Sequence, residues 1–434
     1  MTIDAGWVKL VKKMAPEAFT SRCPFRPRVV FIDGQIKLMA PQEIYTWEAY
    51  FERQFLNTIE SQFQTGAGVV VLGFDDYRHV PTAKAPTQRK RNAHVPVVTF
   101  DEADDLPARP PQMMGGAMRN RAFKTKVISY IVRRLRLHYK NETQRSVIID
   151  YVGTPEVLGR SVSLPAVFDS EPAPLIAQVE TKHEQDSTTP PIQSTLKRGE
   201  CDIKAFVWSA LGPLLIVSTD GDFVPMSLVQ LECMADAQHD IVLYRMTTNT
   251  ETGKRSASGS KKRTYEYVSI RKILDCLHTQ IAHPQPARLF SMFCCLTGCD
   301  FTGNLPNLGP TRVWNNRHAC KNLDTSNEQA ILSFVCKLYL ELFKGKTSVL
   351  NHQVRNLSPD TALDMYKTIE QGVRKGCVKG RIQEAFWHAS RMSVHVRNVL
   401  WTMTYWKELH EYPNPLQYAY GFERIGNIVQ FAVE

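Results

Sequence analysis

Three short apolar runs, each leading into an aspartate, are the feature that most constrains the fold of this chain. They are VVFIDG (29–34), GAGVVVLGFDD (66–76) and PLLIVSTDGDF (213–223). A stretch with apolar residues at helical spacing, 44–59, separates the first two runs. This alternation of strand and helix predicts an α/β fold with a mainly parallel central sheet flanked by helices.

Several other segments extend this pattern. Helical spacing in 7–19 predicts a helix that Pro16 disrupts or ends. We expect further strands at 146–153 and 241–246, a helix in 198–211, exposed loops at 169–198 and 249–263, and a mainly helical region from residue 266 onward, interrupted at 299–312.

Composition limits the class of partner. The chain has 434 residues, 43% of them hydrophobic, which suffices for two or three domains or for one domain with insertions. Its formal net charge is +10, and a basic surplus favours a polyanionic partner because neutralising phosphates releases counterions. A basic protein without such a partner is the alternative.

The cysteines and the hydropathy pattern bear on the compartment. Ten cysteines are present without a CxxC pair, which argues against a structural zinc site and favours reduced thiols in a nuclear or cytoplasmic protein. No apolar run approaches the ~20 residues that a membrane span needs, so we expect no membrane association. The N-terminal stretch lacks the continuous apolar core of a signal peptide.

The positions of the acids are the most informative about function. Asp33, Asp75 and Asp220 follow apolar runs, and the carboxyl ends of such strands meet in one crevice. Ionised acids at close range repel one another, so a crowd of them needs cations. Oxygen ligands without histidine or cysteine favour Mg²⁺ or Mn²⁺. Each acid alone is more often a helix cap or a surface charge, but together they favour a metal site.

Five segments, in order, resemble motifs of the flap endonuclease and xeroderma-pigmentosum-G-type 5′-nucleases, which belong to the PIN-like superfamily. They span residue 7 to about residue 315. The segments are WVKLVKKMAPEAF with VVFIDG, VVLGFDD followed by Lys84 and QRKR, GECDIKAF, STDGDF, and LTGCDFTGNLPNLGPTR.

The resemblance implies a set of metal ligands. All seven carboxylates of the family have a match, and they would hold two ions, Mg²⁺ or Mn²⁺, roughly 4 Å apart. The expected reaction is hydrolysis of phosphodiester bonds in DNA with a free 5′ end or flap, in replication, repair or recombination. The matching residues are Asp33, Asp75, Glu200, Asp202, Asp220, Asp222 and Asp300.

Basic residues and glycines also have counterparts in the family. Lys84 and one of Arg89, Lys90 or Arg91 resemble the basic catalytic pair that neutralises charge on the phosphate. GNLPNLGPTR resembles the helix–three-turn–helix that binds duplex phosphates, often with K⁺, through Gly303, Gly309 and Arg312. A basic stretch would form the arch through which a single strand passes: Arg119, Arg121, Lys124, Lys126, Arg133, Arg134, Arg136 and Lys140.

The resemblance also implies a division of the chain. We expect a nuclease core over 1–298 with an arch insertion at about 78–145, a helix–three-turn–helix region at 299–345 and a helical C-terminal region at 346–434. A monomer is expected. The chain departs from the family in that Asp202 replaces a usual glutamate and that no sliding-clamp-binding box is recognisable near the C-terminus.

Two alternatives stay open. GECDIKAF and CDFTGNLP also resemble segments of cellular 5′→3′ exoribonucleases, so an RNA-directed 5′ nuclease is the second hypothesis. Two segments are unusual for the family, namely an acidic, Pro-rich insert at 101–111 and a long segment between Asp222 and Asp300. Large DNA viruses encode divergent members of this superfamily, including mRNA-degrading ones, and these insertions would suit such a source. A non-catalytic nucleic-acid-binding homologue is the third hypothesis, and the acids at all seven positions disfavour it.

Overall fold

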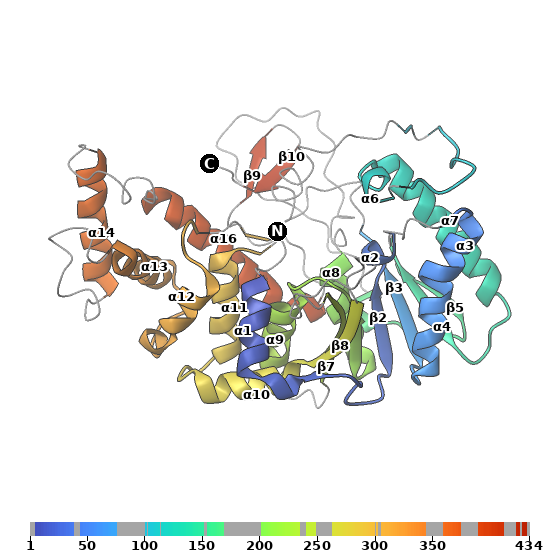
Figure 1. Ribbon diagram of the computed structural model, residues 1–434, viewed down its shortest axis with the longest axis horizontal. Helices are drawn as coiled ribbons and strands as arrows, with labels where there is room; N and C mark the ends of the chain where they lie inside the picture. The colour runs from blue at the N-terminus through green and yellow to red at the C-terminus, as the bar shows by residue number, and fades with distance from the viewer. Residues whose placement is uncertain are drawn as a thin grey trace, which may run out of the picture.

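An eight-stranded mixed sheet lies at the centre of the computed structural model (Figure 1). Alternation of apolar strands and amphipathic helices builds it, as the sequence pattern predicts. The structure describes residues 5–38, 44–75, 100–101, 103–112, 114–151, 154–168, 201–234, 240–248, 263–299, 301–302, 305–343, 359–374, 389–411, 422–425 and 428–431.

The sheet has the order β1-β8-β7-β6-β2-β3-β4-β5. Its inner strands β7, β6, β2, β3 and β4 are parallel, and β8, β1 and β5 pair antiparallel at the two sides. The bounds are β1 (Phe19–Thr20), β2 (Val29–Asp33), β3 (Val69–Gly73), β4 (Ser146–Asp150), β5 (Glu156–Gly159), β6 (Leu214–Val217), β7 (Ile241–Thr248) and β8 (Arg263–Ser269).

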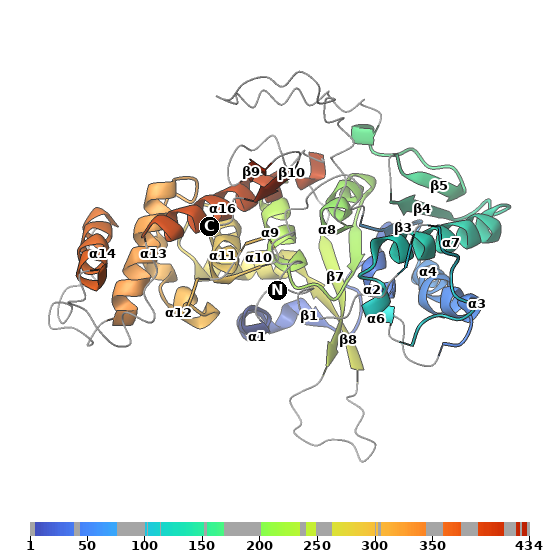
Figure 2. The same ribbon diagram turned by 90° about the horizontal axis from the view of Figure 1, so that it is seen from above.

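Helices cover both faces of this sheet, and the helices late in the chain, α13, α14 and α16, extend away from it (Figures 1 and 2). The bounds are α1 (Ala5–Met14), α2 (Gly34–Leu38), α3 (Trp47–Phe51), α4 (Asn57–Gln64), α6 (Met114–Ala117), α7 (Arg121–Tyr139), α8 (Cys201–Lys204), α9 (Phe223–Cys233), α10 (Ile270–Gln280), α11 (Pro286–Thr297), α12 (Pro310–Asn315), α13 (Glu328–Phe343), α14 (Pro359–Arg374) and α16 (Ala389–Lys407).

Shorter elements complete the described residues. A π-helical turn, Glu52–Leu56, joins α3 to α4, and a small antiparallel pair consists of β9 (Phe422–Ile425) and β10 (Ile428–Phe431). Single 3₁₀ segments lie at Pro16–Ala18, Ala166–Phe168, Ala205–Leu211, Arg317–Cys320 and Leu409–Glu411. In the described part of the chain, no helix is both long and apolar enough to cross a membrane.

Two hydrophobic cores lie on opposite faces of the sheet. Successive side chains of a strand point to opposite faces, so Val30 and Ile32 of β2 pack in one core and Val29 and Phe31 in the other. The first core lies against α3, α4 and α7, and the second against α1, α9, α10 and α11. Burial on both faces explains why β2, β3, β4 and β6 are almost uninterrupted apolar runs.

The α/β class and the parallel pairing of the inner strands are confirmed. The expectation of helix from residue 266 onward is wrong at its start, because β8 continues through Ser269 and pairs with β7. The N-terminal helix ends at Met14 and is followed by a 3₁₀ turn that begins at Pro16, in agreement with the disruption expected there. The expected loop at 169–198 lies outside the described residues, and so does the expected loop at 249–263 except for its last residue, Arg263, which begins β8.

Candidate active site

The topology of the sheet brings three of the expected acids to one edge. Asp33 is the last residue of β2, Asp75 lies just after β3, and Asp220 follows β6. These strands are parallel neighbours in the order β6-β2-β3, so their carboxyl ends lie side by side. From β2 the chain proceeds to β3 and β4 on one side and later to β6 and β7 on the other. Such a reversal of strand order creates a crevice for ligands.

The electrostatics of Asp33 show that four carboxylates are close together. Burial raises the pKa of Asp33 to about 7, and the charges of Asp75, Asp202 and Asp220 act in the same direction. Asp33 is only 7% exposed, so water screens this repulsion poorly. Asp33 therefore lies in a buried, negatively charged environment that disfavours its ionised form.

Hydrogen bonds fix Asp33 relative to Asp220. The Ser218 hydroxyl donates to Asp33 Oδ2 at 3.0 Å, and the backbone N–H of Gln35 donates to Asp33 Oδ1 at 3.0 Å. The N–H of Asp220 donates to the Ser218 hydroxyl oxygen at 3.0 Å. Ser218 thus ties the loop after β6 to the end of β2.

Asp202 enters the site on the short helix α8. The backbone N–H of Cys201 donates to Asp75 Oδ1 at 2.8 Å, which places the start of α8 against the end of β3. The Lys204 ammonium group donates to the carbonyl oxygens of Phe74 and Tyr151, each at 2.8 Å. These bonds hold α8 at the carboxyl ends of β3 and β4 although it is distant from both in sequence.

Asp150 is a further acid at this edge. It ends β4 and is fully buried, where it accepts a hydrogen bond from the Trp208 indole at 3.2 Å and lies 3.5 Å from the Lys204 ammonium group. Because it already has a cationic partner, Asp150 serves as an anchor for α8. The apolar run there predicted a strand, but neither Asp150 nor Lys204 was expected at the site. The signal was the same apolar run leading into an aspartate.

Basic side chains from three elements surround the acids. The Lys124 ammonium group of α7 lies 3.5 Å from Asp75 Oδ2 and is 12% exposed. Burial lowers the pKa of Lys37 in α2 while the charge of Asp33 raises it. For Arg245 of β7, burial likewise lowers the pKa, and Glu266 and Asp220 oppose that shift. Lys37 and Arg245 were not anticipated, because a single basic residue in a helix or strand has no distinguishing sequence pattern.

Asp222 has a different environment from the other acids. It is fully buried at the start of α9, and its N–H donates to Asp220 Oδ1 at 3.0 Å. Burial raises the pKa of the Cys294 thiol in α11, and the charges of Cys299 and Asp222 act in the same direction. Asp222 therefore also lies close to the sulfur-rich end of α11.

The fit of this site to divalent ions can be tested on its donors. Among the residues that the structure describes, no three His, Cys, Asp or Glu side chains converge as ligands of one ion. The mutual repulsion at Asp33 nevertheless requires Asp75, Asp202 and Asp220 to be near, because charges act over longer distances than the ~2 Å of a metal–oxygen bond. The donors are all hard carboxylate oxygens, and the basic side chains of Lys124, Lys37 and Arg245 offset part of their negative charge. Carboxylate oxygens are the type of donor that Mg²⁺ and Mn²⁺ prefer, and a metal centre at this site stays a prediction.

Several expected site residues lie outside the described residues, and their roles stay predictions. They are Lys84, Arg89, Lys90, Arg91, Glu200, Asp300 and Gly303. Of the remaining residues in the expected helix–three-turn–helix, Gly309 lies immediately before α12 as its N-cap, and Arg312 is exposed on that helix.

The basic residues expected in the arch lie mainly on α7. This helix packs an apolar face, including Val127, Ile131 and Leu135, against the sheet, so its opposite face alone can meet a nucleic acid. Arg134 forms an ion pair with Glu48, and Arg136 forms a bidentate pair with Glu156 at 2.7 Å. Arg133 is exposed. The assignment of an arch stays a prediction.

Fold and site together define an α/β protein with a cluster of acids at the carboxyl ends of parallel strands. No protein-family model matches the chain, and a search of curated proteins finds no match. The chemistry of the site and the ordered motifs in the sequence are therefore the basis for assigning a function.

Proposed function

We propose that this protein is a divalent-metal-dependent 5′-nuclease with a PIN-like fold that hydrolyses phosphodiester bonds by a two-metal mechanism. The observation that supports the proposal best is the gathering of Asp33, Asp75, Asp202 and Asp220 from four separate segments at one sheet edge. The expected substrate is DNA with a free 5′ end or flap.

The acids would hold the ions together with Asp222 and the predicted ligands Glu200 and Asp300. When bound, Mg²⁺ or Mn²⁺ supplies activation of water and neutralises charge on the scissile phosphate. The hydrogen bonds from Ser218 and Gln35 orient Asp33, so its oxygens need little reorganisation to bind. Lys204 holds Asp202 in place by fixing α8.

The surrounding cations would act on the substrate. Lys124, Lys37 and Arg245 come from three different elements, and each lies close enough to an acid of the cluster for their charges to interact, so they would lower the negative charge that a polyanionic strand meets. Lys124 is suited to neutralising charge that develops on the phosphate, because it lies within 3.5 Å of Asp75. The family resemblance alone assigns the same role to Lys84 together with Arg89 or Arg91.

The decisive experiment compares end-labelled flap DNA, blunt duplex DNA and 5′-monophosphate RNA in Mg²⁺. We expect Asp220→Asn to lower kcat by orders of magnitude and to leave binding, measured in Ca²⁺, nearly unchanged, because the ions act mainly on the transition state. Asp364→Asn, an exposed acid on α14, is the matched control and should behave as wild type.

The substrate arms of this assay separate the alternatives. The charged side chains of the described site can contact phosphates, which DNA and RNA share, so the site does not distinguish the two substrates. Cleavage of the RNA alone would establish the RNA-directed hypothesis. Binding without cleavage of any substrate would leave a non-catalytic homologue. Wild-type activity in Asp220→Asn would remove this residue from the site and overturn the proposed mechanism.

A further inference from the structure

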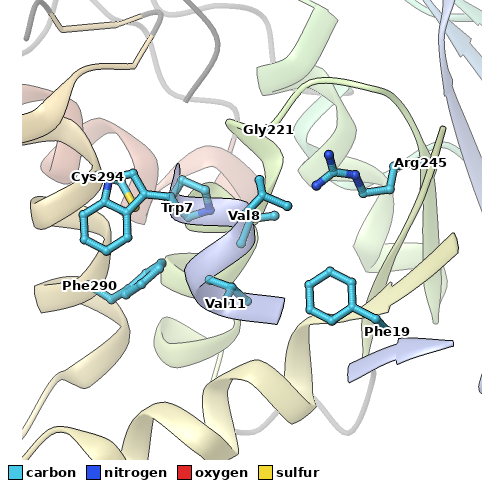
Figure 3. A pocket seen from close by; sticks show the side chains of 10 residues that line it. Trp7, Val8, Val11, Phe19, Gly221, Arg245, Phe290 and Cys294 are labelled. Carbon is cyan, nitrogen blue, oxygen red and sulfur yellow. The ribbon is translucent and has the colours of Figure 1, made fainter. Parts of the chain in front are cut away.

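A small pocket opens beside the acidic site, between α1, the Gly221 turn and α11 (Figure 3). Its walls are mostly apolar and include Trp7, Val8, Val11 and Phe290. Arg245 alone is charged among the described residues that line it, and its guanidinium group extends from β7 toward Val8 and Gly221 (Figure 3). The pocket therefore combines one cation with walls of low polarity.

Arg245 has unused hydrogen-bonding capacity. Its side chain is 17% exposed, and its Nε atom is buried without a hydrogen-bond partner in the part of the chain that the structure describes. The nearest acid, Glu266, lies 3.8 Å from Nε, which is too long for a hydrogen bond. The other Glu266 oxygen accepts from Lys12 at 2.9 Å. A buried donor without an acceptor is costly. Because Nε itself is closed to solvent, a ligand acceptor would bind the guanidinium group where that group lines the pocket.

Backbone hydrogen bonds also place Arg245 close to the acidic cluster. The preceding residue, Tyr244, accepts a hydrogen bond through its carbonyl oxygen from the N–H of Ser218, at 3.2 Å. Ser218 is the residue that ties Asp33 to the Asp220 loop. The guanidinium group is thus held at the flank of the acidic cluster, on the side of α1.

The size and polarity of the pocket limit the kind of chemical group that it can bind. The pocket has about 10 Å³ of space for water-sized groups, which is room for about one such group and too little for a nucleobase or sugar ring. A water molecule needs two to four polar partners, and these apolar walls offer few. An anionic oxygen gains a charge-assisted hydrogen bond from the guanidinium group, and the apolar surroundings strengthen it. A phosphate oxygen, attached to a group that stays outside, fits these limits.

We propose that Arg245 and this pocket form a phosphate subsite that binds a non-bridging oxygen of a phosphodiester flanking the one to be cleaved. The inference rests on the proposed function for its substrate, a nucleic-acid strand. The subsite would position the strand along α1 so that the neighbouring phosphodiester lies over Asp33 and Asp220. Arg245 is a binding residue in this scheme and takes no part in proton transfer.

The test measures equilibrium binding of a fluorescent single-stranded DNA oligonucleotide in Ca²⁺ over a series of salt concentrations. Arg245→Gln should weaken binding by roughly tenfold and flatten the plot of log K against log salt by about one unit, as expected for one lost phosphate contact. Arg245→Lys should keep most of the slope but recover only part of the affinity, because lysine lacks the planar fork.

Two controls keep the test decisive. Arg145→Gln removes an arginine that pairs with Glu60 next to the start of β4, at the opposite edge of the sheet, and should bind as wild type. Glu266→Gln leaves Arg245 in place and removes its nearest acid, so a phosphate subsite predicts equal or tighter binding. If Glu266→Gln instead weakens binding as much as Arg245→Gln does, the arginine is only a structural partner of Glu266.

Failure of this inference differs from failure of the proposed function. Wild-type affinity and slope in Arg245→Gln would overturn the subsite even if the wild-type protein cleaves DNA. A wild-type protein that cleaves nothing in Mg²⁺ would overturn the nuclease proposal, while the binding series would still decide the role of Arg245.

Discussion

The ammonium nitrogen of Lys204 lies 3.5 Å from a carboxylate oxygen of Asp150, and both side chains are shielded from solvent. Asp150 ends β4, and the carbonyl oxygen of Phe74, which also accepts from Lys204, follows β3. One buried cation therefore joins two strand ends to α8, the helix that contains Asp202. The position of a predicted metal ligand depends on an ion pair that contacts no substrate.

Removing one partner of this pair should destabilise the protein strongly. Lys204→Met leaves Asp150 buried without its cation, and we expect the free energy of unfolding to drop by about 3–5 kcal/mol. Chemical denaturation measures it. The double variant Lys204→Met/Asp150→Asn should recover part of the loss. Arg145→Gln breaks a partly exposed pair and should cost no more than about 1 kcal/mol. Equal losses in the two single variants would contradict the buried role.

Lys124 should matter for turnover more than its neighbours on α7. Because its ammonium group lies 3.5 Å from Asp75, Lys124→Ala should lower kcat by about tenfold or more, with a smaller change in binding. Lys126→Ala, two residues along the same helix, is the matched control and points to another face. Single-turnover cleavage beside a binding titration provides both values. An equal loss of kcat in the two variants would show a general effect of charge.

The arginines near the end of α7 should contribute unequally to binding. Arg134 and Arg136 already pair with Glu48 and Glu156, whereas Arg133 is exposed. The arch hypothesis alone predicts a loss of two to three units of salt slope when all three become glutamine. Because Arg134 and Arg136 already have acidic partners, we expect the triple variant to lose less of the salt slope than this. Arg133→Gln alone should cause most of that loss, about one unit. An unchanged slope in the triple variant would show that α7 is ordinary surface.

A buried histidine should make the protein sensitive to acid. Burial lowers the pKa of His395 in α16 to about 4, from an ordinary value near 6.5. Below pH 6.5 the unfolded chain binds a proton that the folded protein excludes, so the free energy of unfolding decreases as pH falls toward 4. The loss should reach roughly 3 kcal/mol.

The measurement is the free energy of unfolding of wild type and His395→Leu across this pH range. The difference between the two proteins isolates His395, because Asp33 and other groups titrate in both. His318→Gln changes an exposed histidine and should keep the wild-type profile. Parallel profiles for wild type and His395→Leu would show that His395 does not control acid stability.

The sequence predicted those parts of the molecule that depend on local pattern. Asp33, Asp75 and Asp220 could be found because a strand buried on both faces is a continuous apolar run, and the acid marks its end. Lys37, Arg245 and Lys204 could not be found, because their importance depends on what tertiary packing places beside them. The local sequence of Lys204 resembles that of any helical lysine.

The wrong prediction of helix in the second half of β8 has a similar origin. The expected helical region begins at residue 266, because Glu266 to Ser269 directly precede the strongly amphipathic helix α10. Pairing with β7, in the register Tyr244 to Tyr267 and Arg245 to Glu266, makes this segment a strand. Hydrogen bonds to a partner strand have no periodicity within the segment itself, so local patterns cannot reveal them.

The reversal of strand order at β2 and β6 also constrains how the protein is made. During synthesis Asp33 and Asp75 leave the ribosome early, but their partner Asp220 lies 187 residues after Asp33 along the chain. Contacts between such distant residues form late, because long loops must close first. A nascent chain that ends before β6 has neither Ser218 nor Asp220, so the acids of β2 and β3 remain without that side of the site. Activity would begin only once the second half of the sheet has docked.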